Sequence, residues 1–217
     1  MAELAIIDYA MGNLRSVENA LRQVAPPGDR ILVTSDPEAV LAADRVIFPG
    51  QGAARDCMRE LRAHGLEEAV REAFRTKPFL GVCMGMQVLM ERSEENGGIE
   101  CLGLYAGEVR HFGESPRDPR DGSRLKIPHM GWNRVEQTRV HPLWRGIESG
   151  ARFYFVHSYY VDPTDHVLIA GTTNYVLPFC STLAHENVFA IQCHPEKSAE
   201  AGLRLLANFA RWDGSAG

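Results

Sequence analysis

Apolar residues in the first half of the chain follow two periodicities in turn, one typical of buried strands and one typical of helices. A short apolar run at residues 4–7 is followed by Leu14, Val17, Leu21 and Val24 at helical spacing, so a strand passes into a helix. Strands are predicted at residues 4–7, 31–34, 45–48 and 79–82, helices at 14–24 and 84–91, and helical segments from about 56 to 74. Consecutive βα units of this kind indicate a parallel sheet covered by helices on both faces.

The second half of the chain shows strand patterns without intervening helices. These strands are predicted at residues 107–111, 127–135, 152–161, 167–175 and 188–193. Residues 112–124 are dense in Pro, Gly, Asp and Arg, and we expect an exposed loop without an assigned role there. Ser198 is expected to cap a final helix in which Leu203, Leu206 and Ala210 share one face.

Length and composition favour one folded unit. With 217 residues and 45% hydrophobic content, the chain can fill a single large core, and it contains no internal repeat or linker. The sequence therefore predicts a single α/β domain over residues 1–217, with a mostly parallel central sheet flanked by helices and a β-rich C-terminal half.

Charge, hydropathy and cysteine usage restrict the partners and the cellular compartment that the sequence predicts. The formal net charge is −5 and no basic stretch interleaves with aromatic residues, which disfavours nucleic acid or an anionic membrane as a partner. No apolar run has the length of a membrane span, and residues 1–9 lack a basic leader. The five cysteines are scattered without CxxC pairs, so no metal site is predicted and a reducing cytoplasm is expected.

The strongest local chemical signal is the stretch GVCMG at residues 81–85, which places Cys83 where a buried strand meets a helix. A cysteine in this position corresponds to a nucleophile elbow, in which flanking glycines let strand and helix approach closely. The helix N-terminus favours a thiolate over a thiol. The same pattern also fits a buried structural cysteine beside packing glycines, so a catalytic base is needed to decide.

His194 and Glu196 are the candidate base and its orienting carboxylate. Among the eight histidines, His194 directly follows a predicted strand and precedes Pro195 and Glu196. Residues i and i+2 on an extended stretch point to the same side, so Glu196 is predicted to reach the imidazole. Together with Cys83 they form a candidate triad, although the HPE tripeptide alone fits a surface histidine better.

Attack on an amide creates an oxyanion, and two backbone segments are predicted to stabilise it. Met84 follows the candidate nucleophile and presents its N–H at the helix N-terminus. A second donor is expected from Gly50, Gln51 and Gly52, because glycine permits close approach and unusual dihedral angles. An ordinary strand-to-helix turn remains the alternative for this loop.

Three short stretches occur in order along the chain: FPGQGA at 48–53, GVCMGMQ at 81–87 and CHPEKS at 193–198. Together they resemble the motifs of the class I glutamine amidotransferases. The stretches IDYAMGNLRS at 7–16, IPHMGWN at 127–133 and YFVHSYY at 154–160 resemble, more narrowly, the glutaminase subunits of imidazole glycerol phosphate synthases. The resemblance extends from Ile7 to the final helix.

This resemblance implies the class I glutamine amidotransferase fold and a glutaminase that delivers ammonia to a separate (β/α)8 cyclase subunit. In such enzymes the cyclase joins the ammonia to a phosphoribulosyl-formimino aminoimidazole carboxamide nucleotide in histidine biosynthesis. By position, the resemblance implies that Cys83 is the nucleophile, His194 the acid and base, and Glu196 the orienting partner. It implies no metal and no organic cofactor.

The resemblance also implies where glutamine and the partner subunit bind. Residues that match positions holding glutamine are Gln87, Ser158 and Tyr159. Residues that match positions at or near the subunit interface are Asn13, Met130, Trp132, Tyr154 and Lys197. From the residues alone, Trp132 as a core aromatic and Lys197 as a solvated charge stay open as alternatives.

Three positions depart from the family pattern. Gln51 stands where the family often has valine, Ala10 where it often has glycine, and Cys193 where an aromatic residue is common. Gln51 bears most on function, since the family's oxyanion loop is expected to flip a peptide there. Cys193 alternates away from His194 along the strand and is predicted to be a core thiol.

The sequence thus predicts hydrolysis of glutamine through a γ-glutamyl thioester on Cys83, with ammonia passed to a cyclase. Three alternatives remain: a glutaminase serving a pyridoxal, nucleotide or anthranilate synthase, a catalytically silent partner-binding module, and a cysteine peptidase. The stretches IDYAMGNLRS and IPHMGWN argue against the first, and the intact triad argues against the second. No peptide groove is indicated for the third.

Overall fold

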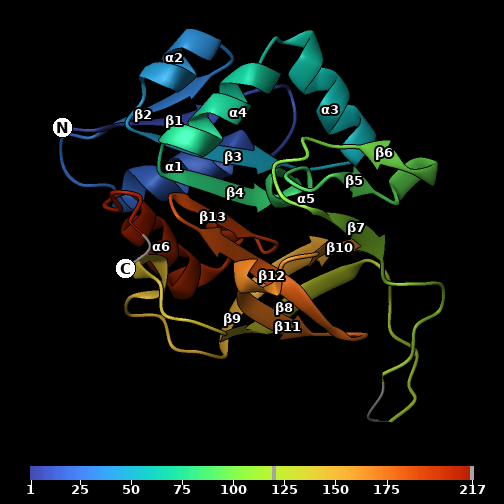
Figure 1. Ribbon diagram of the computed structural model, residues 1–217. Helices are drawn as coiled ribbons and strands as arrows, with labels where there is room; N and C mark the ends of the chain where they lie inside the picture. The colour runs from blue at the N-terminus through green and yellow to red at the C-terminus, as the bar shows by residue number, and fades with distance from the viewer. Residues whose placement is uncertain (119–120, 216–217) are drawn as a thin grey trace.

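A sheet lies between two sets of helices in the computed structural model of the protein, which describes residues 1–118 and 121–215 (Figure 1). The strands are β1 (Glu3–Ile7), β2 (Arg30–Thr34), β3 (Arg45–Gly50), β4 (Phe79–Cys83), β5 (Arg92–Ser93), β6 (Ile99–Glu100), β7 (Gly107–His111), β8 (His129–Gln137), β9 (Ala151–His157), β10 (Tyr159–Pro163), β11 (Ile169–Asn174), β12 (Pro178–His185) and β13 (Val188–Ile191). The α-helices are α1 (Leu14–Val24), α2 (Pro37–Ala42), α3 (Ala54–Ala63), α4 (Glu67–Thr76), α5 (Met84–Gln87) and α6 (Ala199–Phe209). The 3₁₀ turns are η1 (Glu95–Gly97), η2 (Pro142–Trp144), η3 (His166–Leu168) and η4 (Pro195–Lys197).

The sheet has a parallel part and an antiparallel part. Strands β2, β1, β3, β4 and β13 lie side by side and pair in parallel. From β13 the sheet continues through β12, β10 and β7 with antiparallel pairing. Strands β8, β9 and β11 extend this antiparallel part next to β12. The predicted α/β fold, with a mostly parallel centre and a β-rich second half, is confirmed.

Successive residues of the central strands pack into two different cores. In β3, Val46 and Phe48 face the core beneath α2, α3 and α4, whereas Ile47 faces the core beneath α1 and α6. Figure 1 shows α2, α3 and α4 together above the parallel strands, with α6 below them. Because strand residues alternate between faces, a strand covered on both sides is apolar throughout, which explains the continuous apolar runs in the sequence.

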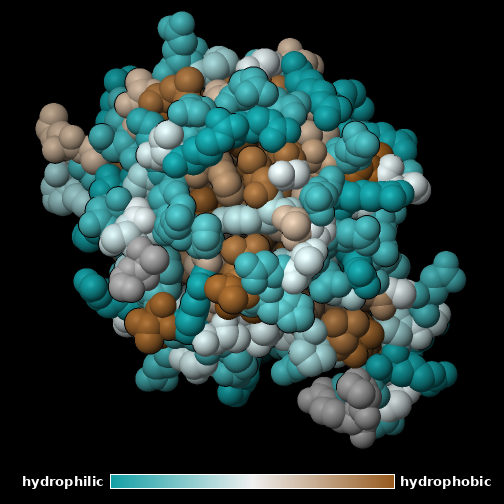
Figure 2. All heavy atoms as spheres, in the orientation of Figure 1, coloured by the Kyte–Doolittle hydropathy of each residue, from teal (hydrophilic) through white to brown (hydrophobic). Residues whose placement is uncertain are grey.

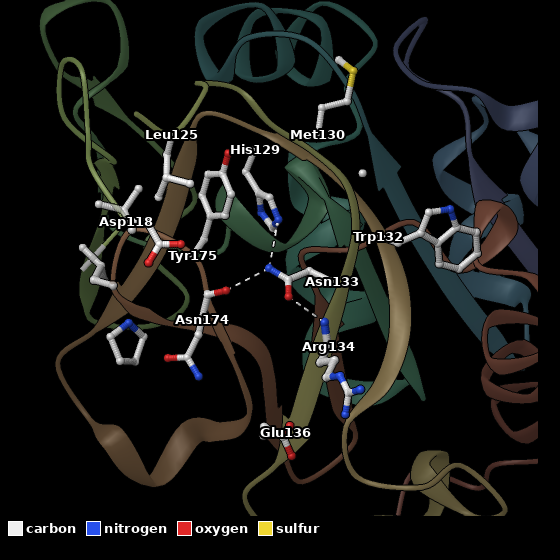
Figure 3. Close-up of a pocket in the computed structure, with 14 residues that line it drawn as sticks. Asp118, Leu125, His129, Met130, Trp132, Asn133, Arg134, Glu136, Asn174 and Tyr175 are labelled. Atoms are coloured by element: carbon white, nitrogen blue, oxygen red, sulfur yellow. Dashed lines mark hydrogen bonds between the residues drawn. The ribbon is translucent and has the colours of Figure 1, made fainter. Parts of the chain in front are cut away.

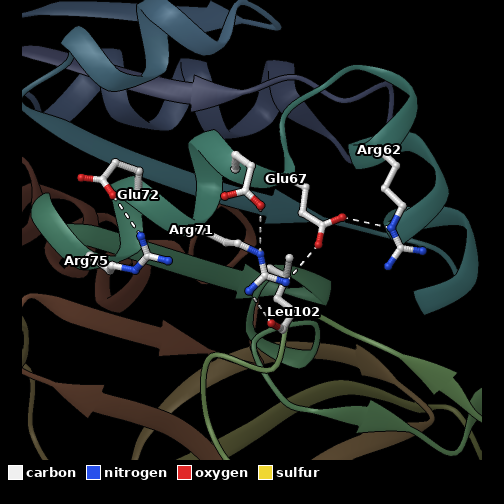
Figure 4. Close-up of polar contacts among 7 residues, drawn as sticks. Arg62, Glu67, Arg71, Glu72, Arg75 and Leu102 are labelled. Carbon is white, nitrogen blue, oxygen red and sulfur yellow. Dashed lines mark hydrogen bonds and ion pairs between the residues drawn. The ribbon is translucent and has the colours of Figure 1, made fainter.

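Polar residues cover most of the face of the molecule that Figure 2 shows. Figure 2 shows hydrophobic atoms in separate groups among hydrophilic ones on the face viewed. On the helical side, Glu67 accepts hydrogen bonds from Arg62 and Arg71, and Arg71 also donates to the carbonyl of Leu102 at 2.7 Å (Figure 4). These contacts join α3, α4 and the segment after β6, and exposed pairs of this kind stabilise a fold only modestly.

The prediction of a helix at residues 84–91 is wrong beyond the first turn. Helix α5 ends at Gln87, and the carbonyls of residues 88–90 accept hydrogen bonds from the backbone N–H groups of residues 102–105 instead of continuing a helix. All four residues of α5 are buried, so the segment is not amphipathic. A returning chain segment therefore replaces the helical bonds that the periodicity predicted.

The strand predicted at residues 152–161 is two strands. Strand β9 pairs with β8, whereas β10 pairs with β7 and β12, so the chain changes partners at Ser158. Similarly, residues 166–168 form a 3₁₀ turn and only Ile169–Asn174 of the predicted strand at 167–175 is extended. Sequence periodicity cannot distinguish one bent strand from two strands with different partners.

Some elements were not predicted and one cap was predicted wrongly. The sequence interpretation did not include α2, β12 or the two-residue strands β5 and β6. Ser198 does precede α6, but its side chain does not cap the helix. Its Oγ accepts a hydrogen bond from the Tyr154 N–H at 2.9 Å and donates to the His194 carbonyl, so it fixes the segment of His194 instead. Residues 119 and 120 of the predicted exposed loop lie outside the described residues.

Candidate active site

Cys83 occupies a strained turn at the end of β4. Its backbone has φ 56° and ψ −109°, a left-handed φ that is uncommon for a residue with a side chain. The turn requires glycine at position 85, because a Cβ there would overlap the carbonyl oxygen of Phe48. The sequence therefore folds locally so that the Cys83 side chain stands at the carboxyl end of a parallel strand, next to the start of α5.

His194 follows β13, the parallel neighbour of β4, and its ring pairs with Glu196. The His194 Nδ1 atom lies 2.9 Å from Glu196 Oε1. The predicted pairing is thus present, but its predicted reason is wrong. His194 is extended, whereas residues Pro195–Lys197 form a 3₁₀ turn that brings Glu196 back toward the ring. The backbone N–H of His194 donates to the Tyr154 carbonyl at 2.9 Å and holds the segment against β9.

Charge at Cys83 and Glu196 stabilises the protonated form of His194. Burial alone lowers the pKa of His194, but negative charge on Cys83 and the hydrogen bond to Glu196 outweigh burial and raise the pKa above its usual range. The Nε2 atom of His194 has no hydrogen-bond partner, so we attribute the effect of Cys83 to charge and not to a formed bond. A buried imidazole with one nitrogen fixed and the other unoccupied can exchange a proton with a bound substrate.

The loop after β3 lies directly beside Cys83. Gly50 pairs with Cys83 across β3 and β4, and the Tyr9 hydroxyl donates to the Pro49 carbonyl at 2.7 Å. Gly52 has φ +87°, which glycine adopts readily. The structure thus brings the predicted oxyanion loop next to the candidate nucleophile.

A cavity of about 360 Å³ contains most of the sequence-predicted catalytic and substrate-binding residues. Its lining residues are Gln51, Gly52, Cys83, Met84, Gln87, Glu95, Pro128, Val156, His157, Ser158, Tyr159, His194 and Lys197. Glu196 and Gly50 stand directly behind this lining through their contacts with His194 and Cys83. A larger cavity of about 790 Å³ on the antiparallel part contains no triad residue (Figure 3). The residues that line the smaller cavity, and not the cavity volume, therefore identify the candidate active site.

Sequence reasoning missed three polar residues of this site. Glu95, in the turn η1, supplies the carboxylate among the cavity-lining side chains and accepts a hydrogen bond from the Ala54 N–H. His157 lines the cavity from the end of β9, inside the quoted stretch YFVHSYY. Gln192 is fully buried, and its Nε2 lies 3.6 Å from the Cys83 sulfur. Its place just before Cys193 and His194 was the available signal, whereas nothing in the sequence pattern marked Glu95.

The predicted interface residues lie mainly on an exposed face beside the site. Met130 and Trp132 on β8 are 62% and 44% exposed, so Trp132 is not a core aromatic. Figure 3 shows both side chains on the opposite side of β8 from His129 and Asn133. Trp132 packs edge to face on its cross-strand neighbour Tyr154 at 6.1 Å. Lys197 is exposed at the rim of the catalytic cavity, and Asn13 directly precedes α1.

The other four thiols are buried and reduced. Burial raises the pKa of Cys57 and Cys180 to about 12 and that of Cys101 to about 11. Burial also raises the pKa of Cys193 well above its usual value, which fits the predicted core thiol. None of these four lines the catalytic cavity. In residues 1–118 and 121–215, no group of three or more His, Cys, Asp and Glu side chains is placed to hold a metal ion.

No helix in the part of the chain that the structure describes is both long enough and apolar enough to cross a membrane.

The fold and the site define a class I glutamine amidotransferase. Residues 5–212 match the family described as glutamine amidotransferase class-I, and the chain belongs to this family. Within it, the chain is similar to the imidazole glycerol phosphate synthase subunit HisH of Thiobacillus denitrificans, with 56% identity covering 97% of this chain and 92% of the relative. The HisH subunit of Aromatoleum aromaticum is also 56% identical, over 98% of this chain and 99% of the relative. These identities place the chain in the HisH group.

Solved structures with low sequence identity share the fold. PurLQS from Thermotoga maritima superposes with a TM-score of 0.70 at 17% identity, covering 97% of this chain and 99% of that chain. The glutaminase domain of CTPS from Trypanosoma brucei gives a TM-score of 0.62 at 16% identity, covering 100% of this chain and 97% of that chain. At such identities the likeness concerns the fold alone.

Proposed function

We propose that Cys83, His194 and Glu196 hydrolyse glutamine to glutamate and ammonia. The observation that carries this proposal is the placement of Cys83 in a strained turn within the same cavity as a buried His194–Glu196 pair. His194 takes the proton of the Cys83 thiol, and the thiolate attacks the carboxamide carbon. Protonated His194 then gives this proton to the departing ammonia, which leaves a γ-glutamyl thioester. His194 then takes a proton from water, and the hydroxide attacks the thioester to release glutamate and the thiol.

The oxyanion of each tetrahedral intermediate needs backbone donors. We assign one to the Met84 N–H and a second to the loop of Gly50, Gln51 and Gly52. The glycines permit the loop to adopt more than one backbone conformation, and this supports a site that is completed only when a partner binds. One missing oxyanion donor lowers the rate by roughly 10²-fold to 10³-fold.

Polar groups around the cavity are suited to an amino-acid substrate. Gln87, Ser158 and Tyr159 line the cavity, and the Glu95 carboxylate can pair with the α-ammonium group of glutamine. The Gln87 amide is held by the Tyr159 carbonyl at 3.1 Å, so this part of the cavity is ordered before substrate binds.

We further propose that the chain delivers ammonia to a (β/α)8 cyclase subunit of an imidazole glycerol phosphate synthase in histidine biosynthesis, within the cytoplasm. The names of the HisH relatives support a synthase of more than one subunit. Met130, Trp132, Tyr154, Lys197 and Asn13 are the residues assigned to this contact. Exposed aromatic and methionine side chains are enriched at protein interfaces, which favours docking over an unused surface.

The experiment is to measure glutamate release by the chain mixed with a cyclase subunit, with and without the phosphoribulosyl-formimino nucleotide. Glutamate release should be slow for the free chain and rise by at least on the order of 10²-fold in the complex with nucleotide, if an oxyanion donor is withheld until then. Equal turnover by the free chain and the activated complex would contradict the proposal that the oxyanion site is completed only in the complex. Failure of the nucleotide to yield imidazole product would instead favour a glutaminase of another synthase.

A further inference from the structure

Two buried histidines connect the larger cavity to the catalytic cavity. His129 lines the larger cavity and His157 lines the catalytic one. The two rings are cross-strand neighbours in β8 and β9, and His129 Nδ1 lies 2.9 Å from His157 Nε2. His129 is also stacked on the ring of Tyr175 at 4.0 Å, and Figure 3 shows it between Tyr175 and β8. The pair takes no part in the proposed chemistry, so its purpose needs a separate explanation.

Carbonyl oxygens at both ends determine which nitrogen of each ring carries the proton. His157 Nδ1 lies 2.7 Å from the Tyr159 carbonyl, which can only accept, so this nitrogen donates. His157 Nε2 is then an acceptor, and His129 Nδ1 donates to it. His129 Nε2 in turn accepts from Asn133 Nδ2 at 3.2 Å, and Asn133 is oriented because the same Nδ2 donates to the Asn174 carbonyl. We call Asn133, His129 and His157 the histidine arm.

Both rings of the histidine arm are neutral near pH 7. Burial lowers the pKa of His129 to about 4, and burial together with the nearby His129 and His194 lowers the pKa of His157 to about 3. An added proton on either ring would place two N–H donors opposite each other. The arm therefore has one stable arrangement, with every hydrogen bond pointing toward Tyr159.

A second set of hydrogen bonds reaches the same carbonyl from the nucleophile. Gln192 Nε2 donates to the Cys83 sulfur, and Gln192 Oε1 accepts from Gln87 Nε2 at 2.9 Å. Gln87 Nε2 also donates to the Tyr159 carbonyl at 3.1 Å. The Tyr159 carbonyl is thus the common acceptor for the histidine arm and for Gln87, and it directly follows Ser158, where the chain leaves β9 for β10.

We infer that the histidine arm is a positioning element, which holds the Tyr159 carbonyl and through it Gln87 in the geometry that binds glutamine. The inference rests on the proposed glutaminase function and deepens it. His129 does not line the catalytic cavity, so it acts on substrate only through His157. Its neighbours on β8, Met130 and Trp132, belong to the exposed face, so one strand serves both the arm and the assigned contact.

The test compares His129→Phe with His129→Asn in the full chain, first by itself and then with a cyclase subunit. Phenylalanine keeps the stacking on Tyr175 but cannot donate, whereas asparagine can place an amide N–H near the position of Nδ1. Loss of the donor should raise the KM for glutamine by roughly tenfold while kcat changes less than about threefold, and asparagine should recover most of the KM. Asn174→Ala, which removes a cavity-lining side chain outside the arm, should leave KM unchanged.

A second measurement reports the arm independently of activity. Nitrogen-15 NMR of the wild-type chain at pH 7 should find both rings neutral with the proton on Nδ1. An unchanged KM in a folded His129→Phe chain, a KM for His129→Asn as high as that for phenylalanine, or a proton on Nε2 of either ring would each overturn the inference. A wild-type chain that does not hydrolyse glutamine would overturn the proposed function instead, and the proton positions would still decide whether the arm exists as described.

Discussion

The parallel and antiparallel parts of the sheet carry different kinds of residue. Strands β3, β4 and β13 end at Gly50, Cys83 and the segment of His194, which are the groups assigned to the reaction. In the antiparallel part, His157 on β9 and Tyr159 on β10 line the cavity, whereas Trp132 on β8 faces outward. Under the proposed function, the parallel part performs the chemistry and the antiparallel part recognises substrate and partner.

The geometry of each part explains the division. The carboxyl ends of neighbouring parallel strands meet at one edge, so residues far apart in sequence converge there on one point. An antiparallel strand instead shows alternate residues to opposite faces, so β8 can direct His129 inward and Trp132 outward. The following four predictions test this division, in order of expected effect.

Removal of the nucleophile should have the largest effect. Cys83→Ala should lower glutamine hydrolysis by at least on the order of 10³-fold, because triad residues act as a unit, while synthesis from free ammonia in the complex continues. Steady-state glutamate release measures the first and product formation with ammonium salt the second. The matched control, Cys180→Ala, removes a buried thiol from the antiparallel part and should keep glutaminase activity. A glutamine-like electrophile should label Cys83 and not Cys193 in mass spectrometry, and retained activity in Cys83→Ala would exclude it as nucleophile.

Acid should destabilise the antiparallel part. Burial lowers the pKa of His129 and His141 to about 4 and that of His157 to about 3, below the ordinary 6.5. Between these values the unfolded chain binds more protons, so the free energy of unfolding falls as the pH falls below about 6.5. From pH 7 to pH 5 each histidine should contribute a loss of at most about 2 kcal/mol, measured by urea denaturation.

One variant checks the acid prediction. His141→Asn can still accept from the Leu143 N–H but does not titrate, so its stability should depend less steeply on pH. An equally steep pH dependence in wild type and in His141→Asn would contradict the lowered pKa of His141.

Truncation of the exposed tryptophan tests recognition. Trp132→Ala should weaken binding to the cyclase subunit by about 2 kcal/mol, or roughly 30-fold in Kd, because large amphipathic anchors dominate interfaces. Isothermal titration or a competition assay measures this. Val140→Ala, an exposed apolar residue beyond the end of β8, is the matched control and should bind normally. Equal affinity of the two variants would place the docking face elsewhere.

Lys197 should give the smallest effect, because an exposed charge contributes little to affinity. Lys197→Ala should leave the Kd within about twofold, yet lower the ratio of imidazole product to glutamate about twofold if the lysine helps to seal the ammonia passage. Both products are measured in one reaction at saturating glutamine. Lys77→Ala, at the distant end of α4, should keep the ratio, and the same ratio in both variants would remove Lys197 from the passage.

The sequence predicted the parallel part better than the antiparallel part, for a physical reason. Strands buried on both faces leave continuous apolar runs, so β1 to β4 were found nearly to the residue. In the second half, the change of partner at Ser158 and the return of residues 102–105 onto the end of α5 depend on tertiary contacts that no local period records. The candidate triad could be proposed from the sequence because its three members lie in two short motifs.

The remaining site residues were predictable only where a motif enclosed them. Gln87 and Tyr159 lie within stretches that resemble the family, and the structure lines the cavity with both. Glu95 lies in a 3₁₀ turn between two short strands, and it reaches the cavity only because that turn folds over the start of α3. Gln192 looked like part of an apolar strand end, and its role as a link between Gln87 and Cys83 needs three-dimensional distances.

Tyr9 sets a boundary on how the oxyanion loop can move. Its hydroxyl holds the Pro49 carbonyl, and the pairing of Gly50 with Cys83 fixes the next residue as well. The loop is therefore held in place as far as residue 50, and the part that can change its backbone conformation begins at Gln51. Under the proposed function, a rotation that aims an N–H at the substrate takes place after Gly50, so Cys83 keeps its position while the donor turns.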